Sequence, residues 1–115
     1  MRLTEHFTLE EFERSATASA RRIDNRVPRE LIPNVRALCE QVLEPLRLFA
    51  GQPIVISSGY RCPALNKAVG GAPNSYHLQG RAADIAYCGD WYRYIRDHLP
   101  HSELIDEGSW IHVAL

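Results

Sequence analysis

The sequence has no long hydrophobic run and no excess of charge of either sign, and both absences exclude classes of protein. No segment approaches the ~20 consecutive apolar residues that a membrane-spanning helix requires. The formal net charge is −1, from 13 Lys and Arg against 14 Asp and Glu. Because no basic field is present to attract a phosphate backbone or an anionic bilayer, we expect neither nucleic acid nor a membrane as a partner.

Cysteine is too scarce for a disulfide framework. The three cysteines, Cys39, Cys62 and Cys88, cannot all pair, and none lies in a C-x-x-C arrangement. The N-terminus lacks the apolar region and the small-residue cleavage site of a signal peptide. We therefore expect a protein with free thiols that is made without an export signal and accumulates in the cytoplasm.

A chain of 115 residues with 45% hydrophobic content has enough apolar side chains for one domain with a single core. Thr8 and Glu11 have the spacing of a capping box, so a short helix is expected to begin at Thr8 and to end near Ser15, with a loop from there to Pro28. Apolar residues at three- and four-residue steps predict the main core helix from about residue 29 or 33 to Ala50, with a bend near Pro45.

Shorter elements are expected in the second half of the chain. Residues 53–58 and 81–87 are predicted strands, and residues 103–106 and 109–115 are predicted to form an antiparallel pair around a tight turn. Short helices are expected at 63–68 and 91–98, and residues 72–80 are expected to form an exposed loop. This order of elements predicts an α+β fold in which helices flank a small antiparallel sheet.

Strand parity singles out a group of side chains that could bind a metal. Asp84 shares a strand face with Ala82 and Ala86, which leaves the carboxylate in an open notch. If this strand neighbours the last one, Asp84 and His112 converge, and a turn at Gly80 brings His77 to the same point. Two imidazoles and one carboxylate are a ligand set typical of catalytic Zn²⁺, which keeps a position for water and lowers its pKa towards ~7.

Each of these residues also has an ordinary structural interpretation. Asp84 could form a salt bridge with Arg81 or Arg61, because an ionised carboxylate in an apolar strand needs a partner. His112 could be a core residue with satisfied hydrogen bonds, and His77 an exposed loop residue. The pair His98 and His101 is interrupted by Pro100, so a solvated helix end is the favoured interpretation there.

Four segments carry a resemblance to a known family: SSGYR at 57–61, LNKAVGG at 65–71, SYHLQGRAADI at 75–85 and WIHV at 110–113. Together they resemble the zinc D-alanyl-D-alanine carboxypeptidase family (peptidase M15, subfamily A). The segment FTLEEF at 7–12 and the loop Ile23-Asp24-Asn25 are similar to its small, phage-type, single-domain members. The resemblance implies a hedgehog/DD-peptidase fold, with one zinc peptidase domain over residues 1–115. Residues 1–27 would be its N-terminal helix and loop, and residues 28–115 its catalytic core.

The resemblance also implies roles for individual residues. His77, Asp84 and His112 would bind one Zn²⁺ per chain. Arg61 would hold a substrate carbonyl or carboxylate, which suits a planar guanidinium. Ser75 matches a substrate-contacting serine of the family, although a local turn involving its hydroxyl explains this residue equally well.

At the position of the general base, the sequence differs from the better-known pattern of the family. Several relatives have an acid three residues before the last histidine, where this chain has Ser109. Glu107 resembles the acid of members with an L-I-x-E segment, and Asp106 is the second candidate. As an alternative, Glu107 is only a solvated turn residue.

The activity implied by the resemblance is zinc-dependent hydrolysis of peptide bonds in peptidoglycan stem peptides. The bond would be D-Ala-D-Ala, as in carboxypeptidases, or L-Ala-D-Glu, as in related phage endolysins. Access to the cell wall would then come by lysis or phage delivery. A catalytically weak, zinc-containing cell-wall binding or phage structural module is the alternative.

Overall fold

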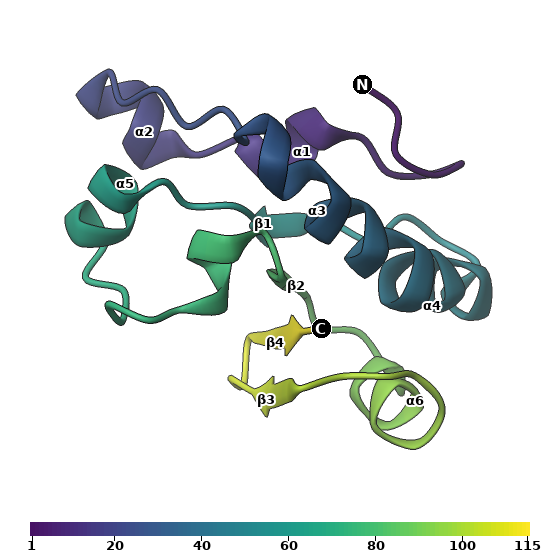
Figure 1. Ribbon diagram of the computed structural model, residues 1–115. Coiled ribbons are helices and arrows are strands. Elements are labelled where there is room, and N and C mark those ends of the chain that lie inside the picture. Colours follow the sequence, from purple (N-terminus) through teal and green to yellow (C-terminus); the bar gives the residue numbers. More distant parts are fainter.

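The centre of the fold is a four-stranded antiparallel sheet, as the computed structural model of residues 1–115 shows (Figure 1). The strands lie in the order β1-β2-β4-β3, so β2 and β4 are the inner pair. Their bounds are Ile56–Ser58 for β1, Ala82–Ala86 for β2, Glu103–Asp106 for β3 and Trp110–Ala114 for β4. The prediction of an α+β fold with a small antiparallel sheet is confirmed.

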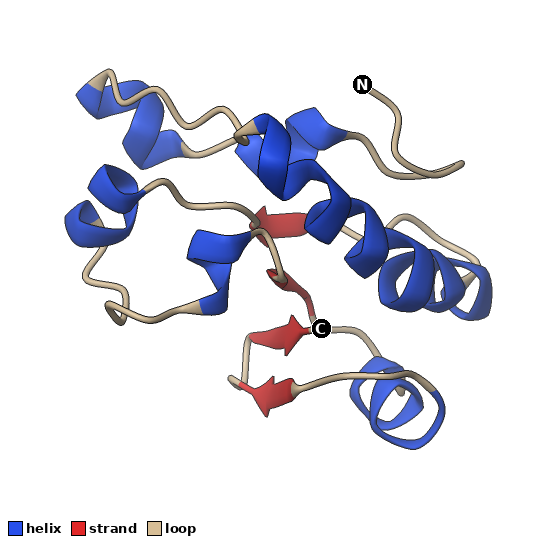
Figure 2. Cartoon of the chain, viewed as in Figure 1, coloured by secondary structure: helices blue, strands red, loops and turns tan.

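Helices surround this sheet, most of them in the first half of the chain (Figure 2). The α-helices are α1 (Leu9–Glu13), α2 (Ala16–Arg21), α3 (Ile32–Leu38), α4 (Glu44–Ala50), α5 (Pro63–Ala68) and α6 (Trp91–His98). Two short 3₁₀ turns, η1 (Arg29–Leu31) and η3 (Tyr76–Gln79), and one π-helical segment, η2 (Cys39–Leu43), complete the chain. No helix is long and apolar enough to cross a membrane.

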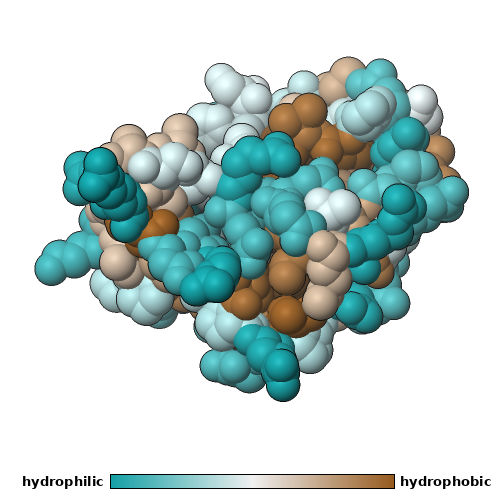
Figure 3. Space-filling model, turned by 90° about the horizontal axis from the view of Figure 1, so that it is seen from above, coloured by the Kyte–Doolittle hydropathy of each residue, from teal (hydrophilic) through white to brown (hydrophobic).

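The core lies between one face of the sheet and the long helical segment from η1 to α4. The inner strands contribute Ala83, Ile85, Ile111 and Val113 to it, all fully buried. Phe7 and Phe12 from the N-terminal segment join the same cluster. Residues 1–27 and 28–115 therefore share one hydrophobic core. The face of the molecule in Figure 3 is mostly hydrophilic, with separate hydrophobic patches.

The first helix begins as its capping box predicts. The backbone N–H of Thr8 donates to Glu11 Oε2 at 2.7 Å, and α1 starts at the next residue. The expected loop after Ser15 is wrong, however, because residues 16–21 form α2. The Ser15 hydroxyl accepts a hydrogen bond from the N–H of Ala18 and caps this helix, and its alanines favour helical backbone.

The long core helix is confirmed in position, and the effect of Pro45 is seen in its middle. The chain turns into the π-helical segment η2 just before α4, whose second residue is Pro45. Proline has no backbone N–H to donate, and the wider π turn lets the helix continue past this position. The helix ends at Gly51, whose φ of 66° is the left-handed conformation that a helix C-terminus favours.

Residues 72–80 differ from the expected exposed loop in one respect that matters for function. Their second half forms η3, which ends at Gly80 with φ of 69°. The turn buries His77 to 3% exposure instead of leaving it in solvent. The interpretation of His77 as an exposed loop residue is therefore wrong.

Asn25 fastens the N-terminal segment to the loop that follows β1. Its side-chain NH₂ donates to the carbonyls of Glu13 and Tyr60, both at 3.0 Å, and its Oδ1 accepts from the N–H of Cys62 at 2.8 Å. Two of these bonds lie on either side of Arg61. Asn25 thus fixes the backbone from which Arg61 projects.

We expect Asn25→Ala to lower the free energy of unfolding by about 1–3 kcal/mol, because the substitution leaves buried backbone groups without partners. Urea denaturation followed by circular dichroism measures this change. Asn74→Ala, at an exposed position, is the matched control and is expected to change stability by less than about 0.5 kcal/mol. Equal stability of the two variants would contradict the role given to Asn25.

Candidate metal centre

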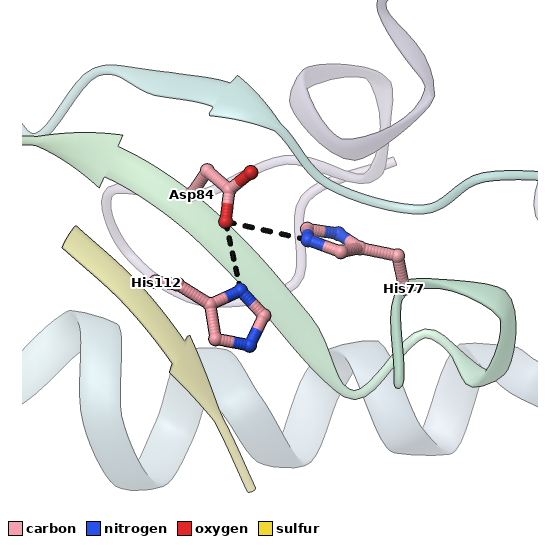
Figure 4. A group of neighbouring side chains, drawn as sticks. All are labelled: His77, Asp84 and His112. Atoms are coloured by element: carbon pink, nitrogen blue, oxygen red, sulfur yellow. Dashed lines mark hydrogen bonds and ion pairs between the residues drawn. The ribbon is translucent and has the colours of Figure 1, made fainter. Parts of the chain in front are cut away.

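The register of the inner strands brings Asp84 and His112 together. Asp84 pairs directly with His112 across β2 and β4. Both side chains leave the sheet on the face opposite the core, and His112 Nδ1 lies 2.9 Å from Asp84 Oδ1 (Figure 4). Ala82 and Ala86 flank Asp84 on its strand and leave the space that these two side chains use.

The third side chain comes from η3, which precedes β2. Its ring nitrogen His77 Nε2 lies 3.3 Å from Asp84 Oδ1 (Figure 4). The other ring nitrogen, Nδ1, lies 2.6 Å from the carbonyl oxygen of Gly59. Because a carbonyl can only accept, Nδ1 donates to Gly59, and Nε2 is the ring nitrogen that faces Asp84.

The three side chains fit a zinc ion by their chemistry and their spacing. One ligand atom from each of His77, Asp84 and His112 lies within 4.8 Å of the other two. Neighbouring ligand atoms of a tetrahedral zinc site, each about 2.1 Å from the metal, lie about 3.4 Å apart. Three protein ligands are also the number typical of catalytic zinc, which keeps a position for water or substrate.

Glu103 supports the group from outside. Its Oε1 lies 2.8 Å from His112 Nε2, the ring nitrogen that points away from Asp84. A carboxylate that accepts the second N–H of a metal-binding histidine fixes the orientation of the ring and makes the first nitrogen a stronger donor. The sequence analysis did not single out Glu103, although its spacing of two from Ile105 places both on one face of β3.

The protonation of the metal-free group follows from these contacts. Burial alone raises the pKa of Asp84, but hydrogen bonds with His112 and His77 outweigh it and hold the pKa well below the usual 3.8. The hydrogen bond to Asp84, helped by that to Glu103 and opposed by burial, raises the pKa of His112 above the usual 6.5. The carboxylate is therefore ionised, as a metal ligand must be.

Arg61 approaches the same carboxylate from the loop after β1. Its Nη2 lies 3.7 Å from Asp84 Oδ2, while Nε donates to Ser58 Oγ and Nη1 to Asn66 Oδ1, both at 3.3 Å. Asn66 is buried, and a Cβ atom at Gly71 would lie 2.1 Å from its Oδ1. Thus Arg61 is held in place by polar neighbours, and the absence of a side chain at Gly71 makes room for them.

The alternative prediction of a salt bridge from Asp84 to Arg81 or Arg61 is confirmed for Arg61 and wrong for Arg81. Arg61 forms it, in addition to the two histidines, whereas Arg81 turns away. The Arg81 guanidinium donates to the carbonyl of Leu115 at 2.9 Å and stacks over the Tyr76 ring.

A pocket of about 260 Å³ opens on this face of the sheet. Its walls bring together nearly every residue that the sequence analysis selected. They are Arg61, Ser75, His77, Asp84, Glu107 and His112, joined by Ile105 and Trp110.

Ser75 and Asp106 are placed differently from the rest of the selected residues. The Ser75 hydroxyl accepts from the N–H of His77 at 3.2 Å, so it forms the local turn and also lines the pocket. Asp106 does not line it: its carboxylate accepts from the Tyr87 hydroxyl and from the N–H of Gly108. Parity explains this, because Asp106 follows Ile105 on β3 and so faces the other way.

The remaining histidines and the cysteines lie outside the group. His98 and His101 belong to the exposed segment at the end of α6. All three cysteines are free; Cys39 is fully buried in the core, where burial raises the pKa of its thiol to about 12. Cys62 caps α5, accepting from the N–H of Leu65 at its sulfur, and Cys88 is exposed.

Two histidines and one aspartate beside a polar pocket suit a zinc site of the catalytic type. A protein-family model described as Peptidase M15 matches residues 5–114, and the chain belongs to this family. Membership implies a metallopeptidase, and M15 peptidases act on peptide substrates. Comparison with curated proteins finds no match.

Removal of the Glu103 carboxylate is expected to weaken zinc binding. Glu103→Ala should lower the affinity by about 10- to 100-fold, since His112 loses its outer partner, and Glu103→Gln should lower it less because an amide oxygen can still accept. Competition with a chromogenic chelator measures the affinity directly. Glu40→Gln, at an exposed helix position, is the control; an unchanged affinity in Glu103→Ala would contradict the assignment.

The raised pKa of His112 predicts how the stability of the zinc-free protein depends on pH. A group whose pKa is raised by folding stabilises the folded state below its unfolded pKa, and this contribution disappears as the pH rises through the folded pKa. The loss of stability in His112→Gln should therefore be greatest at about pH 5–6 and should shrink towards alkaline pH. Urea denaturation of both proteins with a chelator present tests this, and a difference that is constant with pH would contradict it.

Proposed function

We propose that this chain is a zinc-dependent peptidase that hydrolyses a peptide bond in the stem peptides of peptidoglycan. The observation that carries the proposal is the meeting of His77, Asp84 and His112 in a pocket that also holds a guanidinium and a free carboxylate. The family match supports the peptidase chemistry. The choice of a peptidoglycan substrate rests on the resemblance of the sequence motifs.

A bound zinc ion would polarise the substrate carbonyl and lower the pKa of a water molecule beside it. The protein groups around the pocket supply the remaining requirements of hydrolysis. They must hold the ion, orient the substrate, and move a proton from the attacking water to the departing amine.

Glu107 is the group that we assign to proton transfer. It lies in the turn after β3, on the same side of the sheet as the three ligands, and lines the pocket with them. In this role its carboxylate accepts a proton as water attacks the carbonyl carbon, and passes that proton to the nitrogen of the broken peptide bond. Ser109, at the position of the acid in better-known relatives, cannot perform this task near neutral pH.

Arg61 is assigned to the substrate oxygen. Its guanidinium stands at the rim of the pocket with its orientation fixed by Ser58 and Asn66. A fixed positive charge stabilises the negative charge that develops on the carbonyl oxygen during attack, and such contacts are worth about 3–4 kcal/mol in other hydrolases. Ser75 completes the wall on the side of His77 and is assigned a contact to the peptide backbone.

The scissile bond is D-Ala-D-Ala or L-Ala-D-Glu in this proposal, and one experiment separates them. Purified peptidoglycan fragments are incubated with the zinc-loaded protein and analysed by mass spectrometry, where the new termini identify the bond. Zinc bound at one per chain with unchanged fragments would instead favour a cell-wall binding or phage structural module.

Because the cell wall lies outside the membrane, we propose that the protein reaches its substrate through lysis or phage delivery.

Glu107→Gln is expected to lower turnover by about 10²- to 10⁴-fold, because the amide cannot accept the proton. The zinc content should stay at that of the unmodified protein, since Glu107 is not in the ligand group. Asp106→Asn is the matched control: it is the neighbouring acid, it faces away from the pocket, and it should retain turnover. Loss of turnover in Asp106→Asn but not in Glu107→Gln would transfer the role to Asp106.

A further inference from the structure

A second cavity lies on the other side of Arg61. It has a volume of about 300 Å³ and is lined by residues of three segments: Arg14 to Thr17, Ser57 to Arg61, and α5 with Val69 at its end. Helices α2 and α5, which border it, lie side by side in Figure 1. Arg61 lines both this cavity and the metal pocket, so the two adjoin at its side chain.

The charge of this second cavity is entirely positive. Arg14, which is exposed, and Arg61 are its charged residues, and no Asp or Glu lines it. The Arg61 charge is partly balanced by Asp84 at 3.7 Å. The Arg14 charge has no such partner, since the two acids nearest in sequence are engaged elsewhere: Glu10 with the N-terminal amine and Glu13 with the N–H of Val27.

The other polar side chains of the cavity carry hydroxyls and belong to Ser15, Thr17, Ser57, Ser58 and Tyr60, of which the Ser57 hydroxyl already donates to the carbonyl of Asp84. Ser58 Oγ already accepts a hydrogen bond from Arg61 Nε, so its own hydrogen remains available for donation. Guanidinium and hydroxyl donors together favour a negatively charged, oxygen-rich group, and a planar carboxylate matches a guanidinium in two parallel hydrogen bonds.

The geometry points to a carboxylate-binding subsite at Arg14, which holds the free carboxylate of an acidic residue in the substrate peptide. This inference rests on the proposed function, because a stem peptide supplies the ligand: the D-glutamate residue that the notation L-Ala-D-Glu names. Binding there would place the acid beyond Arg61 as seen from the metal. The subsite would thus favour peptides with a free carboxylate over their amidated forms.

Isothermal titration calorimetry tests this without turnover if the zinc-loaded Glu107→Gln protein is used. The probes are two forms of one stem peptide that contains D-glutamate. In one form the D-glutamate carboxylate that is not part of a peptide bond is free, and in the other form it is converted to the amide. We expect the free acid to bind about tenfold more tightly, the gain typical of one exposed charge-assisted pair. Arg14→Gln in the same background should bring the ratio of the two dissociation constants close to one.

Two further variants sharpen the result. Arg14→Lys keeps the charge but not the paired geometry, so it should retain part of the preference. Arg21→Gln removes an equal charge from the far end of α2, outside the cavity, and should retain all of it. Equal binding of both peptides, no binding of either, or a tenfold preference that survives Arg14→Gln would each overturn the subsite.

The outcomes for the subsite and for the proposed function are separate. Preference for the free acid without any cleavage by the zinc-loaded unmodified protein supports the subsite and contradicts the peptidase proposal. Cleavage of both peptides with no preference in binding contradicts the subsite and leaves the peptidase proposal standing.

Discussion

The pairing of β2 with β4 is the constraint on which the site depends. It places Asp84 directly opposite His112, with both side chains on the face away from the core. A shift of either strand by one residue would turn its ligand side chain towards the buried helices and bring Ile85 or Ile111 to the surface. The burial of these apolar neighbours therefore fixes the position of the candidate metal ligands and also stabilises the sheet.

A second set of contacts ties the remaining groups to that pair. The His77 ring donates to the carbonyl of Gly59, and the N–H of Arg61 donates to the carbonyl of His77 at 3.1 Å. The loop after β1 and the turn before β2 thus hold each other, so Arg61 and His77 reach Asp84 as one unit. Asn25 secures the same loop from the N-terminal side, which gives residues 1–27 a share in positioning the site.

Prediction from the sequence succeeded where a local pattern decides the structure. The capping box at Thr8, the stop at Gly51 and the alternation around Asp84 each depend on a few neighbouring residues, and the structure has them. It failed at α2, where the Ser/Ala/Thr composition was interpreted as a loop although Ser15 caps a helix. It also missed Glu103 and the contacts of Asn25, because their partners lie 9 and up to 37 residues away.

The sequence by itself determined the family, the fold class and the residue types that a zinc ion needs, because these follow from motif spacing and strand parity. Only the tertiary structure decided which acidic side chains lie beside the three candidate ligands. It turns Glu107 and Glu103 to the site and Asp106 away from it, since alternate residues of β3 face opposite sides of the sheet. It also decided that the cavity beyond Arg61 is positively charged, because Arg14 and Arg61, 47 positions apart in the chain, meet there through packing that no local pattern specifies.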